Sequence, residues 1–87
     1  MVQLGKAKEI LKEGTVIILD ITNTLIKTGD YLFYRFNDRF EKTEILSIQK
    51  DNIPVPSIEN GEIGIQLDQK IAKNTNLWIK NQFINNN

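Results

Sequence analysis

The residues best suited to chemistry lie in one short stretch, residues 31–42, where aromatic and basic side chains are interleaved. This stretch holds five of the seven aromatic residues and three cations: Tyr31, Phe33, Tyr34, Phe36 and Phe40, with Arg35, Arg39 and Lys42. Aromatic rings stack on nucleobases, and cationic side chains bind phosphates. The pattern therefore indicates contact with RNA, and we expect Arg35, Arg39, Lys42 and Tyr34 to lie on the contact side.

A second interpretation of the same stretch is structural. Asp38, Glu41 and Glu44 nearly cancel the three cations, and alternating aromatic residues can also fill a small core. The whole chain has 11 Lys plus Arg and 11 Asp plus Glu, so its formal net charge is zero, which argues against a nucleic-acid binder held by bulk charge. Trp78, near the end of the last expected strand, is expected to cover the core.

Enzymatic chemistry has few candidates in this chain. The sequence contains no His and no Cys, so the usual general base near neutral pH, a thiolate nucleophile and a Cys-based zinc site are all excluded. It also lacks the P-loop motif and the dinucleotide-binding glycine motif, and its carboxylates show no spacing typical of an acid–base pair. We expect a non-enzymatic protein with no catalytic residue, no cofactor, no metal site and no nucleotide hydrolysis.

The elements that must position these residues are strands. Turn-forming residues recur about every ten positions, and apolar residues alternate with period 2 over 15–21, 43–49, 62–67 and 77–80. Strict alternation over 43–49 places Ile45 and Ile48 on opposite faces. Residues 5–13 have a composition that also suits a helix, but the glycine at their start and the turn at Gly14 favour a β-hairpin with the strand that follows. The pattern predicts an all-β fold of the sandwich or barrel type.

Two local signals refine this arrangement. Asn37 and Asp38 interrupt the aromatic stretch and predict a loop there. Pro54 and Pro56 cannot donate to a strand ladder, so their segment is expected at an edge or in a connection.

The length of 87 residues suits one domain. We expect a single β-barrel domain over residues 1–80 and a polar C-terminal tail over residues 81–87. The start of the chain shows no apolar segment of signal-peptide length, and the longest aliphatic run, residues 16–19, is far shorter than the ~20 residues of a membrane helix. The sequence therefore predicts a cytoplasmic protein without membrane contact.

Six short motifs follow one another in a recognisable order. Residues 5–10 are a glycine–lysine segment, residues 14–19 a glycine turn into an apolar strand, and residues 25–32 contain a lysine–x–glycine–aspartate turn. A serine–apolar–glutamine step, an x–proline–valine piece and a glycine-containing strand follow at 44–49, 53–55 and 60–65. In this order they resemble the second domain of translational GTPases such as elongation factor Tu, over residues 4–80. Small elongation-factor-like proteins and the C-terminal domain of the collagenase-like peptidase family are similar.

The resemblance implies a closed antiparallel barrel of about six strands, of the translation-protein domain 2 type. In that family the GTPase chemistry belongs to another domain, so the resemblance implies binding alone. The second domain of elongation factor Tu helps to hold the aminoacyl end of transfer RNA near a glycine-containing strand, which corresponds here to Gly61, Glu62 and Gly64. Where relatives often carry a second glycine–aspartate turn, this chain has residues 74–76, and Asn74 tolerates the left-handed conformation such a turn needs.

Two functions remain open at this point. The first is a binding module that contacts transfer RNA, ribosomal RNA or a translation or RNA-modification partner. The alternative is a protein–protein interaction module that docks onto an enzyme or self-associates, with no RNA contact.

Overall fold

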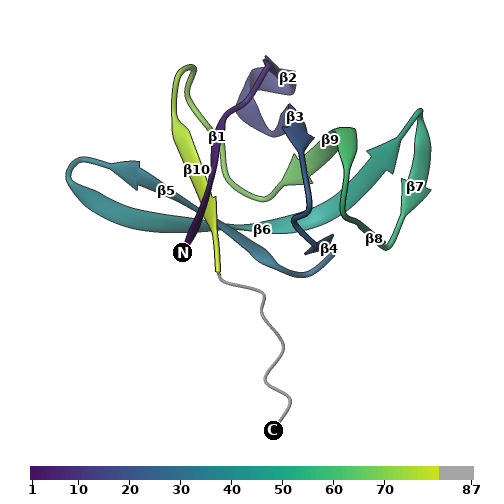
Figure 1. Ribbon diagram of the computed structural model, residues 1–87. Coiled ribbons are helices and arrows are strands. Elements are labelled where there is room, and N and C mark those ends of the chain that lie inside the picture. The colour runs from purple at the N-terminus through teal and green to yellow at the C-terminus, as the bar shows by residue number, and fades with distance from the viewer. Residues whose placement is uncertain (81–87) are drawn as a thin grey trace, which may run out of the picture.

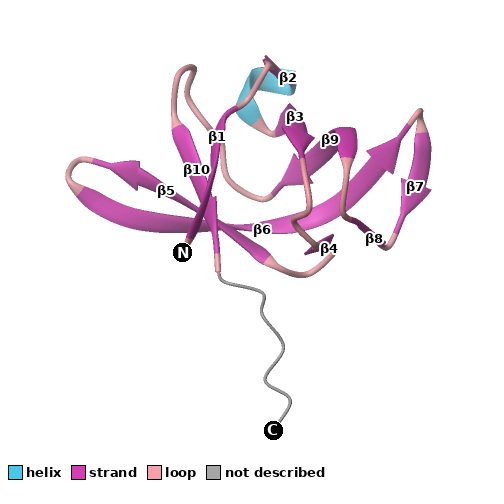
Figure 2. Cartoon of the chain, in the orientation of Figure 1, coloured by secondary structure: helices cyan, strands magenta, loops and turns pink. Residues whose placement is uncertain are grey.

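The computed structural model describes residues 1–80 and consists of strands with one short helical turn (Figure 1, Figure 2). The strands are β1 (Val2–Lys6), β2 (Glu9–Leu11), β3 (Val16–Ile21), β4 (Ile26–Lys27), β5 (Tyr31–Phe36), β6 (Arg39–Lys50), β7 (Ile53–Val55), β8 (Ser57–Ile58), β9 (Gly61–Leu67) and β10 (Asn76–Ile79), and the helical turn is η1 (Lys12–Gly14). The all-β prediction is confirmed. The predicted tail over 81–87 lies outside the described residues.

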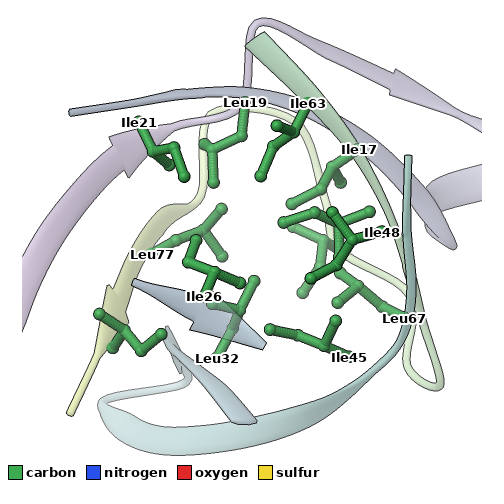
Figure 3. Close-up of a cluster of buried hydrophobic side chains, with 13 residues drawn as sticks. Ile17, Leu19, Ile21, Ile26, Leu32, Ile45, Ile48, Ile63, Leu67 and Leu77 are labelled. Carbon is green, nitrogen blue, oxygen red and sulfur yellow. The ribbon is translucent and has the colours of Figure 1, made fainter. Parts of the chain in front are cut away.

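The strands form one large antiparallel sheet in the order β1-β10-β5-β6-β9-β3-β2, and β7 pairs with β6 beside this path. The 12-residue strand β6 belongs to both halves of the sheet, because its first part pairs with β5 and its second part pairs with β9 and β7. It therefore curves the sheet around a common interior, as Figure 1 shows. A separate two-stranded sheet, β4–β8, adds Ile26 to the same interior (Figure 3).

The predicted closure of the barrel is wrong. Within residues 1–80 the sheet path ends at β1 and β2, and these two strands do not pair with each other, so the β1-β10-β5-β6 half stays an open half-barrel. Only Ala7 and Lys8 separate the two strands along the chain. The N–H of Lys8 already donates to the carbonyl of Ile18 at 2.7 Å, so the backbone turns to β3 as soon as it leaves β1.

The core is aliphatic throughout. Thirteen buried hydrophobic side chains form one cluster, all of them Ile or Leu (Figure 3): Ile17, Leu19, Ile21, Ile26, Leu32, Ile45, Ile48, Ile63, Ile65, Leu67, Ile71, Leu77 and Ile79. Of the aromatic residues in 31–40, only Tyr34 packs partly against this cluster. The expectation that alternating aromatics fill the core is therefore wrong, because the other aromatic side chains of β5 and β6 lie outside the core cluster.

One irregularity decides which side chains of β6 reach the core. Strict alternation predicts opposite faces for Ile45 and Ile48, yet both are buried, at 0% and 1% exposure. The register against β9 shifts between Ile45 and Ser47, which marks a β-bulge that turns the following residues over. Leu46, inside the bulge, is left exposed.

The turns follow the sequence signals. Asn37 and Asp38 both have left-handed backbone angles, with φ of 53° and 64°, as a two-residue type I′ hairpin requires. This turn fixes the register of β5 against β6, in which Phe36 faces Arg39. Asn74 likewise has a φ of 66°, so asparagine supports the turn expected before β10.

Two further predictions are confirmed. β2 and β3 form an antiparallel hairpin through η1. Pro54 lies in β7, which pairs with β6 alone and stands outside the main strand path. A residue without an N–H can occupy that position because one side of β7 needs no donor.

Candidate nucleic-acid interface

The strand register collects side chains from four strands on the outer face of the open half-barrel. Residues directly opposite each other in a ladder project to the same face. Trp78 of β10 faces Gln3 of β1 on one side and Phe33 of β5 on the other, and Phe33 in turn faces Lys42 of β6. These four residues therefore form one row across the sheet.

Neighbouring positions extend this row. Lys6 faces Asn76, Arg35 faces Phe40, and Tyr31 faces Glu44. Tyr31 and Arg35 each lie two positions from Phe33, so they share its face, and their partners Glu44 and Phe40 do as well. Lys6 joins this outer face because its partner Asn76 lies two positions from Trp78. We call the resulting surface the aromatic face and define it by seven side chains: Tyr31, Phe33, Phe40 and Trp78, with the cations Lys6, Arg35 and Lys42.

The aromatic rings of this face contact one another and remain accessible. The rings of Phe40 and Trp78 meet edge to face, with centroids 5.2 Å apart and an interplanar angle of 83°. Tyr31 is 42% exposed and Phe40 is 47% exposed. Trp78 is half-buried on the outer face while its neighbours Leu77 and Ile79 enter the core, so the expectation that Trp78 covers the core is wrong.

Two cations rest on rings of the same face. The guanidinium carbon of Arg35 lies over the ring of Phe40, 5.5 Å from its centroid, and the ammonium nitrogen of Lys42 lies 4.5 Å from the centroid of Tyr31. Both distances are within the range of cation–π attraction. The cations are thus held above the rings rather than extended away from the sheet.

The charges of this neutral chain are unevenly distributed. The register places three cations on the aromatic face, Lys6, Arg35 and Lys42, against one carboxylate, Glu44. A second carboxylate, Asp38 in the adjoining turn, has an oxygen 3.9 Å from a nitrogen of Arg35. A net charge of zero over the chain is therefore compatible with a locally basic surface.

Arg39 and Tyr34, predicted as contact residues, lie on the other face of the β5–β6 hairpin. Tyr34 faces Glu41 and Arg39 faces Phe36 across the ladder, and Arg39 forms an ion pair with Glu41 at 3.2 Å. Burial raises the pKa of the Tyr34 hydroxyl, and the nearby carboxylate of Glu41 raises it further. The structure therefore brings Arg35 and Lys42 together with the rings and leaves Arg39 and Tyr34 on the opposite side.

The remaining predicted contact residues, Gly61, Glu62 and Gly64, lie on β9 in the other half of the sheet. Glu62 faces Asp20, and the ammonium of Lys8 joins both carboxylates, at 2.6 Å and 3.4 Å. The hydrogen bond to Glu62, followed by that to Asp20, raises the pKa of Lys8. The single charge of Lys8 thus offsets one of the two carboxylate charges, and the cluster stays net negative.

Gly64 lies in a shallow hollow on this second surface. The hollow has a volume of about 500 Å³, and its lining includes Ile18, Gln49, Glu62 and Gln66. Gly64 faces Ile18 across the ladder, and a methyl group built on Gly64 would lie 3.6 Å from the end of the Ile18 side chain. The missing side chain therefore helps to keep the hollow open.

Within residues 1–80, no group of three or more Asp, Glu, His or Cys side chains is placed to hold a metal ion. In the same part of the chain no helix is long and apolar enough to cross a membrane.

Sequence reasoning missed Lys6, Phe33 and Trp78 as members of one surface. In the sequence Phe33 is one of several aromatic residues in the stretch 31–42, and Lys6 and Trp78 lie far from it along the chain. The two-residue turn at Asn37 and Asp38 was a usable signal for part of the face, because it sets Phe40 opposite Arg35.

Comparison with family models and with curated proteins found no match to this chain.

Proposed function

We propose that this chain is a non-enzymatic, cytoplasmic binding module whose aromatic face binds RNA. The observation that carries the proposal is the gathering of Tyr31, Phe33, Phe40 and Trp78 with three cations on one sheet surface. None of these aromatic side chains belongs to the core cluster. Large aromatic rings that the core does not use are available for a partner.

The chemistry of this surface suits a polynucleotide. Stacking of a base on an aromatic side chain contributes about 1–3 kcal/mol, and each cation that meets a phosphate releases counterions. A strand that crosses β10, β5 and β6 would find rings in the centre and cations at Lys6, Arg35 and Lys42. The low net charge of the chain means that binding should depend on stacking more than on bulk attraction.

The order of sequence motifs supports the same partner class. We propose that the half-barrel is of the translation-protein domain 2 type, with transfer RNA or ribosomal RNA, alone or with a translation or RNA-modification partner, as its ligand. Glu62 and Gly64 would then offer a second contact at the hollow on β9, with Gly61 next to them at the start of the strand. The aromatic face and the hollow lie on the outer faces of different halves of the sheet, so variants can separate their contributions.

The test is a titration of the purified chain with fluorescently labelled transfer RNA at several salt concentrations. The double variant Arg35→Gln/Lys42→Gln is compared with Arg39→Gln/Lys27→Gln, which removes the same charge from outside the aromatic face. We expect the first variant to bind several-fold more weakly and to lower the slope of log affinity against log salt by about 1.4, at about 0.7 per lost phosphate contact on a single strand. The second variant should bind like the wild type.

Equal losses in both double variants would contradict the proposal, because they would indicate non-specific attraction to total charge. Absence of binding by the wild type at low salt would contradict it as well. A loss confined to Gly64→Ala would instead place the RNA site at the hollow on β9.

A second candidate function is a protein–protein interaction module. It is favoured by the exposed ring of Tyr31 and the half-buried Trp78, since such side chains are common in protein interfaces. It is also favoured by the ion pairs of Arg35 and Arg39, which already have carboxylate partners. Such a module would dock onto an enzyme or self-associate through the same face. Affinity capture from cell extract, with and without nuclease, separates the two functions. Partners that are lost after nuclease indicate RNA, and partners that survive indicate protein.

A further inference from the structure

The two cations that contact rings on the aromatic face are held in different ways. Arg35 is held from two sides, by the ring of Phe40 at 5.5 Å and by the carboxylate of Asp38 at 3.9 Å. Among the described residues 1–80, Lys42 rests on the ring of Tyr31 alone, at 4.5 Å, and it faces Phe33 in the ladder. Arg35 thus has a ring and a carboxylate beside it, whereas Lys42 has a ring.

The rings behind Arg35 form a continuous series of contacts. Arg35 lies over Phe40, and Phe40 meets Trp78 edge to face at 5.2 Å. This series crosses from β6 over β5 to β10. Its exposed end is a guanidinium group, which is planar, weakly hydrated and able to stack on aromatic surfaces, whereas an ammonium group is a compact and strongly hydrated charge.

We propose that Arg35 acts as a stacking surface for an unpaired nucleobase, with Phe40 and Trp78 supporting it from behind. The ligand of the aromatic face is then single-stranded RNA with unstacked bases, and not an RNA duplex. This inference rests on the proposed function and names the class of RNA and the residue that receives the base. The charge of Arg35 still attracts the phosphates, as do those of Lys6 and Lys42, and the two lysines need no planar group.

The preference for single strands follows from the geometry of the two forms of RNA. In a duplex the base faces are stacked on one another, and proteins reach mainly the phosphates and the 2′-hydroxyl groups. A guanidinium that lies over a ring on a broad sheet surface can contact the face of a base only where that base is not stacked on its neighbours. Two lysines alone would not discriminate between the two forms.

The experiment uses variants that keep the charge and change the shape of the cation. Arg35→Lys removes the planar group, Lys42→Arg adds one at the neighbouring position, and Arg39→Lys is the matched control on the other face of the hairpin. Each is titrated with a labelled single-stranded oligoribonucleotide of about ten nucleotides, within the site sizes of small β folds, and with a duplex of the same length. Emission from Trp78, the only tryptophan, reports whether each free variant keeps the native face.

We expect the wild type to bind the single strand about tenfold or more tightly than the duplex, which is the weight of one stacked base. Arg35→Lys should bind the single strand about tenfold more weakly, with an unchanged salt slope and an unchanged affinity for the duplex. Arg39→Lys should stay within about twofold of the wild type, because it changes no cation of the aromatic face. Lys42→Arg adds a second planar cation beside the rings, so it should bind the single strand several-fold more tightly and the duplex no more tightly.

The outcomes distinguish this inference from the function on which it rests. If the wild type binds RNA but Arg35→Lys retains full affinity and native Trp78 emission, the stacking role is overturned and the RNA-binding function stands. Equal affinity of the wild type for duplex and single strand overturns the preference for unpaired bases. If the wild type binds neither form, both proposals fail and a protein partner is indicated.

Discussion

The ring of Phe40 on β6 meets the ring of Trp78 on β10 edge to face at 5.2 Å, although β5 lies between these two strands. The contact therefore joins the free end of the β5–β6 hairpin to a strand that lies much later along the chain. Four predictions follow from this contact and from three others in the structure.

Removal of the Phe40 ring should loosen this junction. We expect Phe40→Ala to lower the free energy of unfolding by about 1 kcal/mol, the usual worth of an aromatic pair. It should also move Trp78 emission to longer wavelength, because the indole gains water. Phe36→Ala is the control, since Phe36 is 57% exposed and lies on the other face of the hairpin. Unchanged Trp78 emission in Phe40→Ala would show that the contact is not maintained in solution.

Within residues 1–80, Thr43 is the one buried polar residue, at 1% exposure. Its hydroxyl donates to the carboxylate of Asp68 at 2.8 Å and accepts the N–H of Gln69 at 3.1 Å. We expect the isosteric change Thr43→Val to destabilise the protein by about 1–2 kcal/mol in urea unfolding, because the N–H of Gln69 loses its partner. The exposed Thr28→Val should stay within about 0.5 kcal/mol of the wild type. Equal stability of both variants would show that water replaces the hydroxyl without cost.

Asp68 should make the stability depend on acid pH. The N–H of Glu44 and the hydroxyl of Thr43 donate to its carboxylate, and these bonds hold the pKa of Asp68 below its ordinary value of 3.8. Because the folded pKa is the lower one, the stabilisation is present above pH 3.8 and is lost as pH falls from there through the folded pKa. Thermal unfolding at a series of pH values should show this loss in the wild type and a flatter profile in Asp68→Asn. Parallel profiles would contradict the assignment.

Two glycines with similar backbone angles should differ in their tolerance of a methyl group. Gly14 has a φ of +98°, and a Cβ there would lie 2.9 Å from the backbone oxygen of Ile71, whereas Gly29 has a φ of +95° and open space around it. Gly29→Ala carries conformational strain alone, which we expect to cost about 1–2 kcal/mol. Gly14→Ala adds a backbone clash and should cost about 3 kcal/mol or more in denaturant unfolding. Equal losses would show that the segment around Ile71 moves aside freely.

The sequence predicts local structure well where one short segment contains all the information. The period-2 patterns in 15–21 and 62–67 give β3 and β9, and the pattern in 62–67 also gives the inner face of β9. The turn at Asn37 and Asp38 gives the β5–β6 hairpin. Pro54 correctly marks a strand outside the main path. These features depend on side-chain alternation and turn angles, which neighbouring residues determine.

The features that were missed depend on pairing between distant segments. No local pattern shows that β10 inserts between β1 and β5, so Lys6 and Trp78 could not be placed beside Phe33. The bulge at Leu46 reverses the alternation of β6 without a glycine or proline to announce it. Arg35 and Arg39 have the same parity in sequence, yet the two-residue turn between them puts them on opposite faces.

The open half-barrel has a consequence for how copies of this chain meet in concentrated solution. An unpaired sheet edge is a template for strand addition and can nucleate aggregation. At the two ends of the main strand path within residues 1–80, β1 carries a register shift at Gln3 and Gly5 that interrupts its ladder, and β2 is only three residues long. An irregular edge and a short edge are both poor templates for another strand. The register shift in β1 and the shortness of β2 therefore protect these two edges, which the sheet leaves open.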